Sequence, residues 1–152
     1  MVPAVGNLRT SARLAVIKQA LHDASGHFGM QVVHFSLQAN HLHLVVEAES
    51  ARELSRAMKG LAVRVAVALN RLAKRRGTVF ADRYFARVLE SPRAVAHALR
   101  YVFENYRHHA RGAVAWSWRD PYASSAQVPL RQPAVWLLRV GWKIHDWRKP
   151  EG

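Results

Sequence analysis

Three stretches of the chain carry apolar residues at the three- and four-residue spacing of an amphipathic helix. This pattern predicts helices over residues 11–25, 51–74 and 92–109. The second is the clearest, because Ser50 and Glu53 form a capping-box pattern ahead of a continuous apolar stripe. A capping serine followed by proline, Ser91-Pro92, is an equally typical start for the third.

Two other stretches have the composition and alternation of β-strands. Residues 32–37 are rich in β-branched and aromatic side chains, and the polar interruption Gln38-Ala39-Asn40 separates them from the strand that carries His41 and His43. We therefore predict a hairpin with a three-residue connection. In its second strand His41 and His43 point to one face and the intervening apolar side chains to the other. Short extended segments are also expected over residues 78–80 and 84–89.

The composition adds a strong positive charge. The 152 residues include 23 Lys and Arg against 10 Asp and Glu, a formal charge of +13 without the nine histidines. Such an excess is typical of nucleic-acid binding, and a basic protein with solvated charged faces is the alternative. The absence of cysteine excludes disulfides and thiolate metal sites. With no apolar run of about 20 residues and no secretory pattern, we expect one cytoplasmic domain.

Two histidines on one strand face can approach a divalent cation, but they need a third ligand. The third helix offers a polar stripe at spacings of four, four and three residues: His97, Tyr101, Asn105 and His108. From the residues alone, a Tyr–Asn pair one turn apart is more often packing than catalysis. His34 is expected to be a surface strand histidine, and Tyr106 to belong to the core.

The order of these motifs resembles that of the single-tyrosine HUH transposases, most closely the REP-associated tyrosine transposases and their insertion-sequence relatives. The resemblance rests on the His-Leu-His strand, on RGTVFADRY at residues 76–84 and on LRYVFEN at residues 99–105. It spans residues 32–109, about half of the chain.

The resemblance implies a role for each matching residue. His41 and His43 would be paired metal ligands, Tyr101 the nucleophile and Asn105 the amide that completes the metal set. The implied activity is that of a metal-dependent endonuclease and strand transferase, which uses Mg²⁺ or Mn²⁺ and a covalent 5′-phosphotyrosine intermediate. The protein would act as a monomer or homodimer.

The substrate implied by the resemblance is single-stranded DNA with a hairpin. Such substrates are bound by basic grooves interleaved with aromatic side chains. The residues expected to form this surface are Arg75, Arg76, Arg83, Tyr84 and Arg87.

The implied fold is α+β, with a ferredoxin-like or RNA-recognition-like antiparallel sheet and helices packed on one face. Residues 1–112 would form the catalytic domain, and residues 113–152 an irregular extension with a basic tail. The resemblance also implies a strand ahead of the first helix, for which residues 1–9, with Pro3 and Gly6, are a poor candidate. The strand is therefore missing, replaced by irregular pairing, encoded upstream of Met1, or lost from a decayed copy.

Two other functions remain open. The missing strand favours a catalytically inactive or domesticated nucleic-acid-binding protein of the same fold. A metal-binding regulatory protein is the third alternative, and the basic excess disfavours it.

Overall fold

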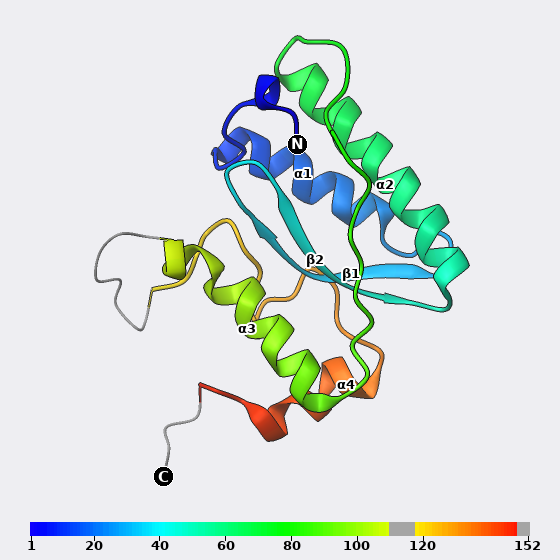
Figure 1. Cartoon of the computed structure of the whole chain (residues 1–152), viewed down its shortest axis with the longest axis vertical. Helices are drawn as coiled ribbons and strands as arrows, with labels where there is room; N and C mark the ends of the chain where they lie inside the picture. The colour runs from blue at the N-terminus through cyan, green and yellow to red at the C-terminus, as the bar shows by residue number, and fades with distance from the viewer. Residues whose placement is uncertain (110–117, 149–152) are drawn as a thin grey trace.

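The helices and strands follow the predicted order. The computed structural model describes residues 1–109 and 118–148, except the side chains of residues 108 and 109. Its elements are η1 (Pro3–Val5), α1 (Ser11–Ala24), β1 (Met30–Leu37), β2 (Leu42–Ala48), α2 (Ala51–Leu72), α3 (Pro92–His109), α4 (Trp136–Arg139) and η2 (Gly141–His145). The predicted α+β class is confirmed (Figure 1). No helix in the described part of the chain is long and apolar enough to cross a membrane.

Each long helix begins at a serine or threonine whose side chain caps it. The Thr10 hydroxyl accepts a hydrogen bond from the backbone of Arg13 at the start of α1. Ser50 and Ser91 do the same for α2 and α3. Each such cap contributes about 1 kcal/mol, because it satisfies a backbone N–H that the helix leaves unpaired.

The two strands form an antiparallel hairpin in which His43 lies opposite Ser36. The connection comprises residues 38–41, one residue longer than predicted, so His41 lies just ahead of β2. The register shifts between Val32 and His34, which marks a β-bulge at Val33. The bulge turns Val33 and His34 to the same face of the sheet.

Helices cover both faces of the sheet, rather than the one face expected (Figure 1). On the first face α1 and α2 pack over the larger core, which includes Phe35 and Leu37. On the second face α3 packs over Val33 and Val45 through apolar residues such as Leu99. Because β1 is buried on both faces, its sequence does not alternate cleanly, and periodicity gave no sign of the second layer.

The far edge of β1 is closed by a segment from the end of the chain. Residues 122–130 exchange backbone hydrogen bonds with Leu37, Phe35 and Val33, over distances of 2.8–2.9 Å. After this segment, α4 and η2 pack Leu138 and Trp142 against α3. The expected boundary at residues 112–113 and the end of the basic tail, residues 149–152, lie outside the described residues.

No described residue takes the place of the strand expected ahead of α1. The first ten residues form η1 and an irregular path, with backbone bonds from Val2 to Val79 and from Leu8 to Ala39. The outer edge of β2 makes no backbone hydrogen bond to any residue that the structure describes. The segments expected to be extended, 78–80 and 84–89, join no sheet among those residues.

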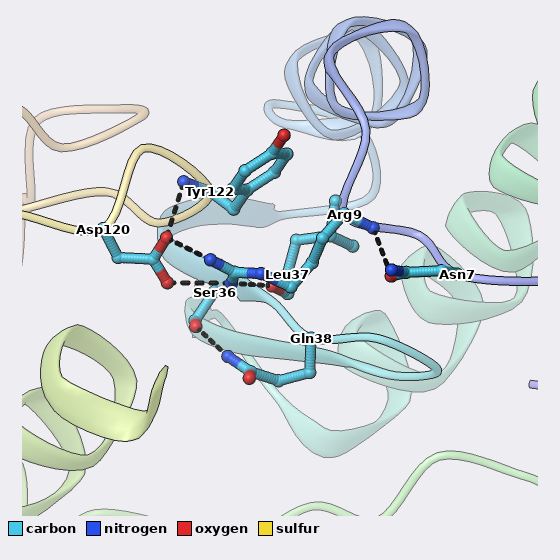
Figure 2. Close-up of polar contacts among 7 residues, drawn as sticks. All are labelled: Asn7, Arg9, Ser36, Leu37, Gln38, Asp120 and Tyr122. Atoms are coloured by element: carbon cyan, nitrogen blue, oxygen red, sulfur yellow. Dashed lines mark hydrogen bonds and ion pairs between the residues drawn. The ribbon is translucent and has the colours of Figure 1, made fainter. Parts of the chain in front are cut away.

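A buried ion pair links Arg9, just ahead of α1, to Asp120, which follows α3 in the sequence (Figure 2). Both Nη atoms of Arg9 donate to the Asp120 carboxylate, at 2.9 and 2.7 Å, and Nη1 also donates to the carbonyl of Leu37. The guanidinium lies over the rings of Tyr106, at 3.8 Å, and Tyr122, at 4.5 Å. Tyr106, expected in the core, is half-buried and packs beneath this cation.

His34 is buried, contrary to the expectation that it lies on the surface. Its ring meets Phe103 of α3 at 4.9 Å between centroids, and its Nδ1 shares a hydrogen bond of 3.1 Å with the Ser124 hydroxyl. Burial lowers the pKa of His34 from 6.5 to about 4. The covering residues come from α3 and from the end of the chain, which strand periodicity does not reveal.

The buried, neutral His34 predicts a loss of stability in acid. Because the pKa is lower in the folded state, the stabilising effect is complete above about pH 6.5 and is lost as pH falls towards 4. A shift of this size corresponds to about 3 kcal/mol. The free energy of unfolding, measured with denaturant at neutral pH and near pH 5, should fall less in His34→Leu than in the wild type. An unchanged pH dependence in this variant would contradict the assignment.

Candidate functional site

The two histidines of the hairpin converge on one point. His43 lies on β2 and faces α3, and His41 lies in the connection just before it. Their Nε2 atoms are 3.0 Å apart, and their rings meet edge to face at 4.7 Å between centroids. Both imidazoles therefore direct the same nitrogen to a shared position.

The spacing of these nitrogens suits a metal ion. Two ligands at right angles and ~2.1 Å from a metal lie ~3.0 Å apart, which is the separation expected in octahedral coordination. The side-chain oxygen of Asn40 accepts a hydrogen bond from His41 Nδ1 at 2.7 Å, which leaves Nε2 as the atom with the lone pair. The sequence reasoning did not assign Asn40 this orienting contact, although its position directly before His41 was a usable signal.

The surroundings of His43 favour its neutral form. Burial lowers its pKa, and the neighbouring charge of His41 lowers it further. A neutral imidazole binds a metal ion without first losing a proton.

Helix α3 brings Tyr101 to the histidine pair. The ring of Tyr101 meets that of His43 edge to face, at 5.0 Å between centroids. Its side chain is 52% exposed, so the phenol is open to a ligand from solvent while its ring rests on the imidazole. The structure thus brings together Tyr101 and the two histidines, which lie almost sixty positions earlier in the sequence.

Asn105 lies one turn further along α3 and is only 2% exposed. Its amide nitrogen is buried without a hydrogen-bond partner, an exception among buried polar groups. Because the nitrogen and oxygen of an amide are interchangeable by rotation, the unpartnered position can equally hold the oxygen, which is a metal ligand. The described residues contain no cluster of three or more His, Cys, Asp or Glu side chains that could hold a metal ion, so a third protein ligand would have to be of another type.

The residues expected to bind nucleic acid divide into two groups. Arg75 is folded into the turn after α2, where it donates to the side chain of Asn70, at 2.6 Å, and to the carbonyl of Thr78. The other four are exposed: Arg76, Arg83, Tyr84 and Arg87. Phe85, between them, is 93% exposed, which leaves an aromatic face free for stacking.

Comparison with known families adds an independent line of evidence. The family model described as "Transposase IS200 like" matches residues 7–105, well over half of the chain. The matched region contains both histidines and Tyr101, and it ends at Asn105. Comparisons with the curated proteins and with the solved structures gave no match. The chain belongs to the IS200-like transposase family, which supports a DNA-processing function.

Proposed function

We propose that this protein is a metal-dependent single-stranded DNA endonuclease and strand transferase with Tyr101 as its nucleophile. The observation that carries the proposal is the contact of Tyr101 with His43, whose Nε2 meets that of His41. The phenol supplies a nucleophile, and the two convergent imidazoles supply ligands for a metal ion that would polarise the phosphate.

The proposed reaction exchanges one phosphodiester bond for another. The Tyr101 phenol loses its proton to water, its oxygen forms a bond to phosphorus, and the bond from phosphorus to the 3′-oxygen breaks. The departing oxygen takes a proton and becomes a 3′-hydroxyl, while the 5′-phosphate stays on Tyr101. A later attack by a 3′-hydroxyl reverses these steps and joins strands. A Mg²⁺ or Mn²⁺ ion held by His41, His43 and Asn105 would supply Lewis-acid polarisation of the phosphate oxygens.

The proposed substrate is a single strand flanked by a hairpin, as in the REP-associated subtype. The exposed segment from Arg83 to Arg87 supports this, because it carries two cations and two aromatic rings outside any helix or strand. Aromatic faces stack on bases that are not already stacked in a duplex.

The proposal is tested by a covalent-adduct assay. The wild-type protein, incubated with labelled single-stranded hairpin DNA and Mn²⁺, should yield a protein–DNA species that survives a denaturing gel. A metal chelator should prevent the adduct, and fully duplex DNA should not form it. Binding without an adduct on every DNA tested would instead favour an inactive nucleic-acid-binding protein of the same fold.

Salt dependence should identify the phosphate contacts. Each cation that neutralises a phosphate contributes about 0.7 to the slope of log affinity against log salt for single strands. Arg83→Gln and Arg87→Gln should each lower the slope by about this amount. Arg75→Gln is the matched comparison: it should mainly lower the thermal midpoint, because it removes the bonds to Asn70 and Thr78. An affinity independent of salt in the wild type would contradict a phosphate-led interface.

A further inference from the structure

A cavity of about 540 Å³ lies between α3 and the residues that follow it. The part of α3 that lines it includes Phe103 and Arg107, and the opposite wall includes Trp118, Arg119, Ser124 and Trp147. Most of this wall lies beyond residue 105, where the family match ends. The cavity is therefore built largely from the chain's own extension.

The cavity offers flat aromatic surfaces. Trp118 is 37% exposed, and the centroid of its ring lies 5.7 Å from that of Tyr106. Trp147 is fixed by a hydrogen bond of 2.7 Å from its indole nitrogen to Glu104, and it lies 6.4 Å from Phe103. Trp147 also packs against Trp142, at 6.0 Å between centroids, and lies under the Arg148 guanidinium. The partly exposed indole of Trp118 is therefore the stacking surface for a planar ring.

The charge of the cavity is positive. Its two carboxylates are already engaged: Glu104 pairs with Arg100 and Asp120 with Arg9. Arg119 donates to the neutral side chain of Gln127, at 3.2 Å, and makes no ion pair among the described residues. Arg107 and Arg148 line the same space, and Arg148 pairs with Asp146. A planar ring carrying an anionic group is the ligand that fits these walls.

We propose that this cavity holds one nucleotide of the single-stranded substrate, with its base against Trp118 and its phosphate beside Arg119. That the nucleotide belongs to a single-stranded DNA substrate rests on the proposed function. The aromatic and cationic lining itself does not depend on Tyr101.

The test compares short oligo(dT) with an abasic oligomer of the same length and with the mononucleotide dTMP, using tryptophan fluorescence and anisotropy. Trp118→Ala should weaken oligo(dT) binding by about tenfold, as expected for one lost base stack. It should leave the abasic oligomer unaffected, and Trp118→Phe should restore part of the loss. Arg119→Gln should weaken both oligomers, whereas Arg52→Gln, an exposed charge on α2, should weaken both to a smaller extent.

Three results would overturn the proposal. The first is unchanged oligo(dT) affinity in Trp118→Ala at an unchanged thermal midpoint. The second is an equal loss for the oligo(dT) and abasic oligomers. The third is saturation by dTMP at the same affinity as oligo(dT), which would identify a site for free nucleotides. The same titrations in Tyr101→Phe should match the wild type, so failure of the cleavage chemistry is distinguishable from failure of this site.

Discussion

Replacing Tyr101 with phenylalanine is expected to abolish the covalent protein–DNA adduct while DNA affinity and the thermal midpoint stay unchanged. The ring that contacts His43 remains, and only the attacking oxygen is removed. Loss of a nucleophile reduces cleavage by on the order of a thousandfold or more, because no other group at the site can take its place. The measurement is adduct yield on a denaturing gel, together with strand cleavage under single-turnover conditions.

Tyr106→Phe provides the matched control, since it removes a phenol from the same helix. Tyr106 lies against Arg9 and Trp118 rather than the histidine pair, so its variant should form the adduct normally. His43→Ala should lose the adduct despite retaining Tyr101. Adduct formation by Tyr101→Phe at the wild-type rate would assign the nucleophile to another residue.

Asp120→Ala is expected to cost about 3–5 kcal/mol of stability, the usual cost of breaking a buried ion pair by removing one partner. Asp120 is 7% exposed, and its carboxylate accepts hydrogen bonds from both Nη atoms of Arg9 and from the backbone N–H of Tyr122. Its loss leaves the guanidinium partly buried and without a counter-ion. Denaturant unfolding at neutral pH, followed by tryptophan fluorescence, measures the change.

Arg100→Gln is the comparison for an exposed pair. Arg100 lies one turn from Glu104 on α3, and its side chain is largely solvated, so its removal should cost about 0.3–0.5 kcal/mol. Arg9→Met combined with Asp120→Leu should recover much of the stability lost in Asp120→Ala, because no unpaired charge is left behind. If Asp120→Ala lowered the free energy of unfolding as little as Arg100→Gln, the ion pair of Arg9 with Asp120 would not be an important source of stability.

Local signals gave the helices of this protein with good accuracy. Ser50 and Ser91 cap their helices as predicted, because capping depends on residues three positions apart. The predicted and observed bounds of α3 coincide at 92–109, and those of α2 differ by two residues at one end.

Features that depend on distant contacts were not predictable in this way. Helix α3 packs on the second face over Val33, at the bulge, and the buried His34 contacts Ser124, ninety residues away. The bond from Arg9 to Asp120 spans an even longer separation. A periodic pattern predicts which side chains are buried, but it does not predict which helix or strand packs against them.

The candidate site stands between these cases. The alternation of the strand placed His41 and His43 on one face, but only the resemblance connected them to Tyr101. The structure brings the three together, and their chemical roles stay predictions until the adduct assay is done. The cavity beside Trp118 left no comparable signal, because its walls come from a part of the chain without regular periodicity.

The hydrogen bonds between β1 and residues 122–130 have a consequence for synthesis. A chain emerging from the ribosome completes both strands and α3 before this closing segment is available. Until then the hairpin has unpaired N–H and C=O groups along both borders, and an isolated two-stranded sheet is marginally stable. Truncation after residue 109 should therefore yield a polypeptide that self-associates through the unpaired edges of its two strands.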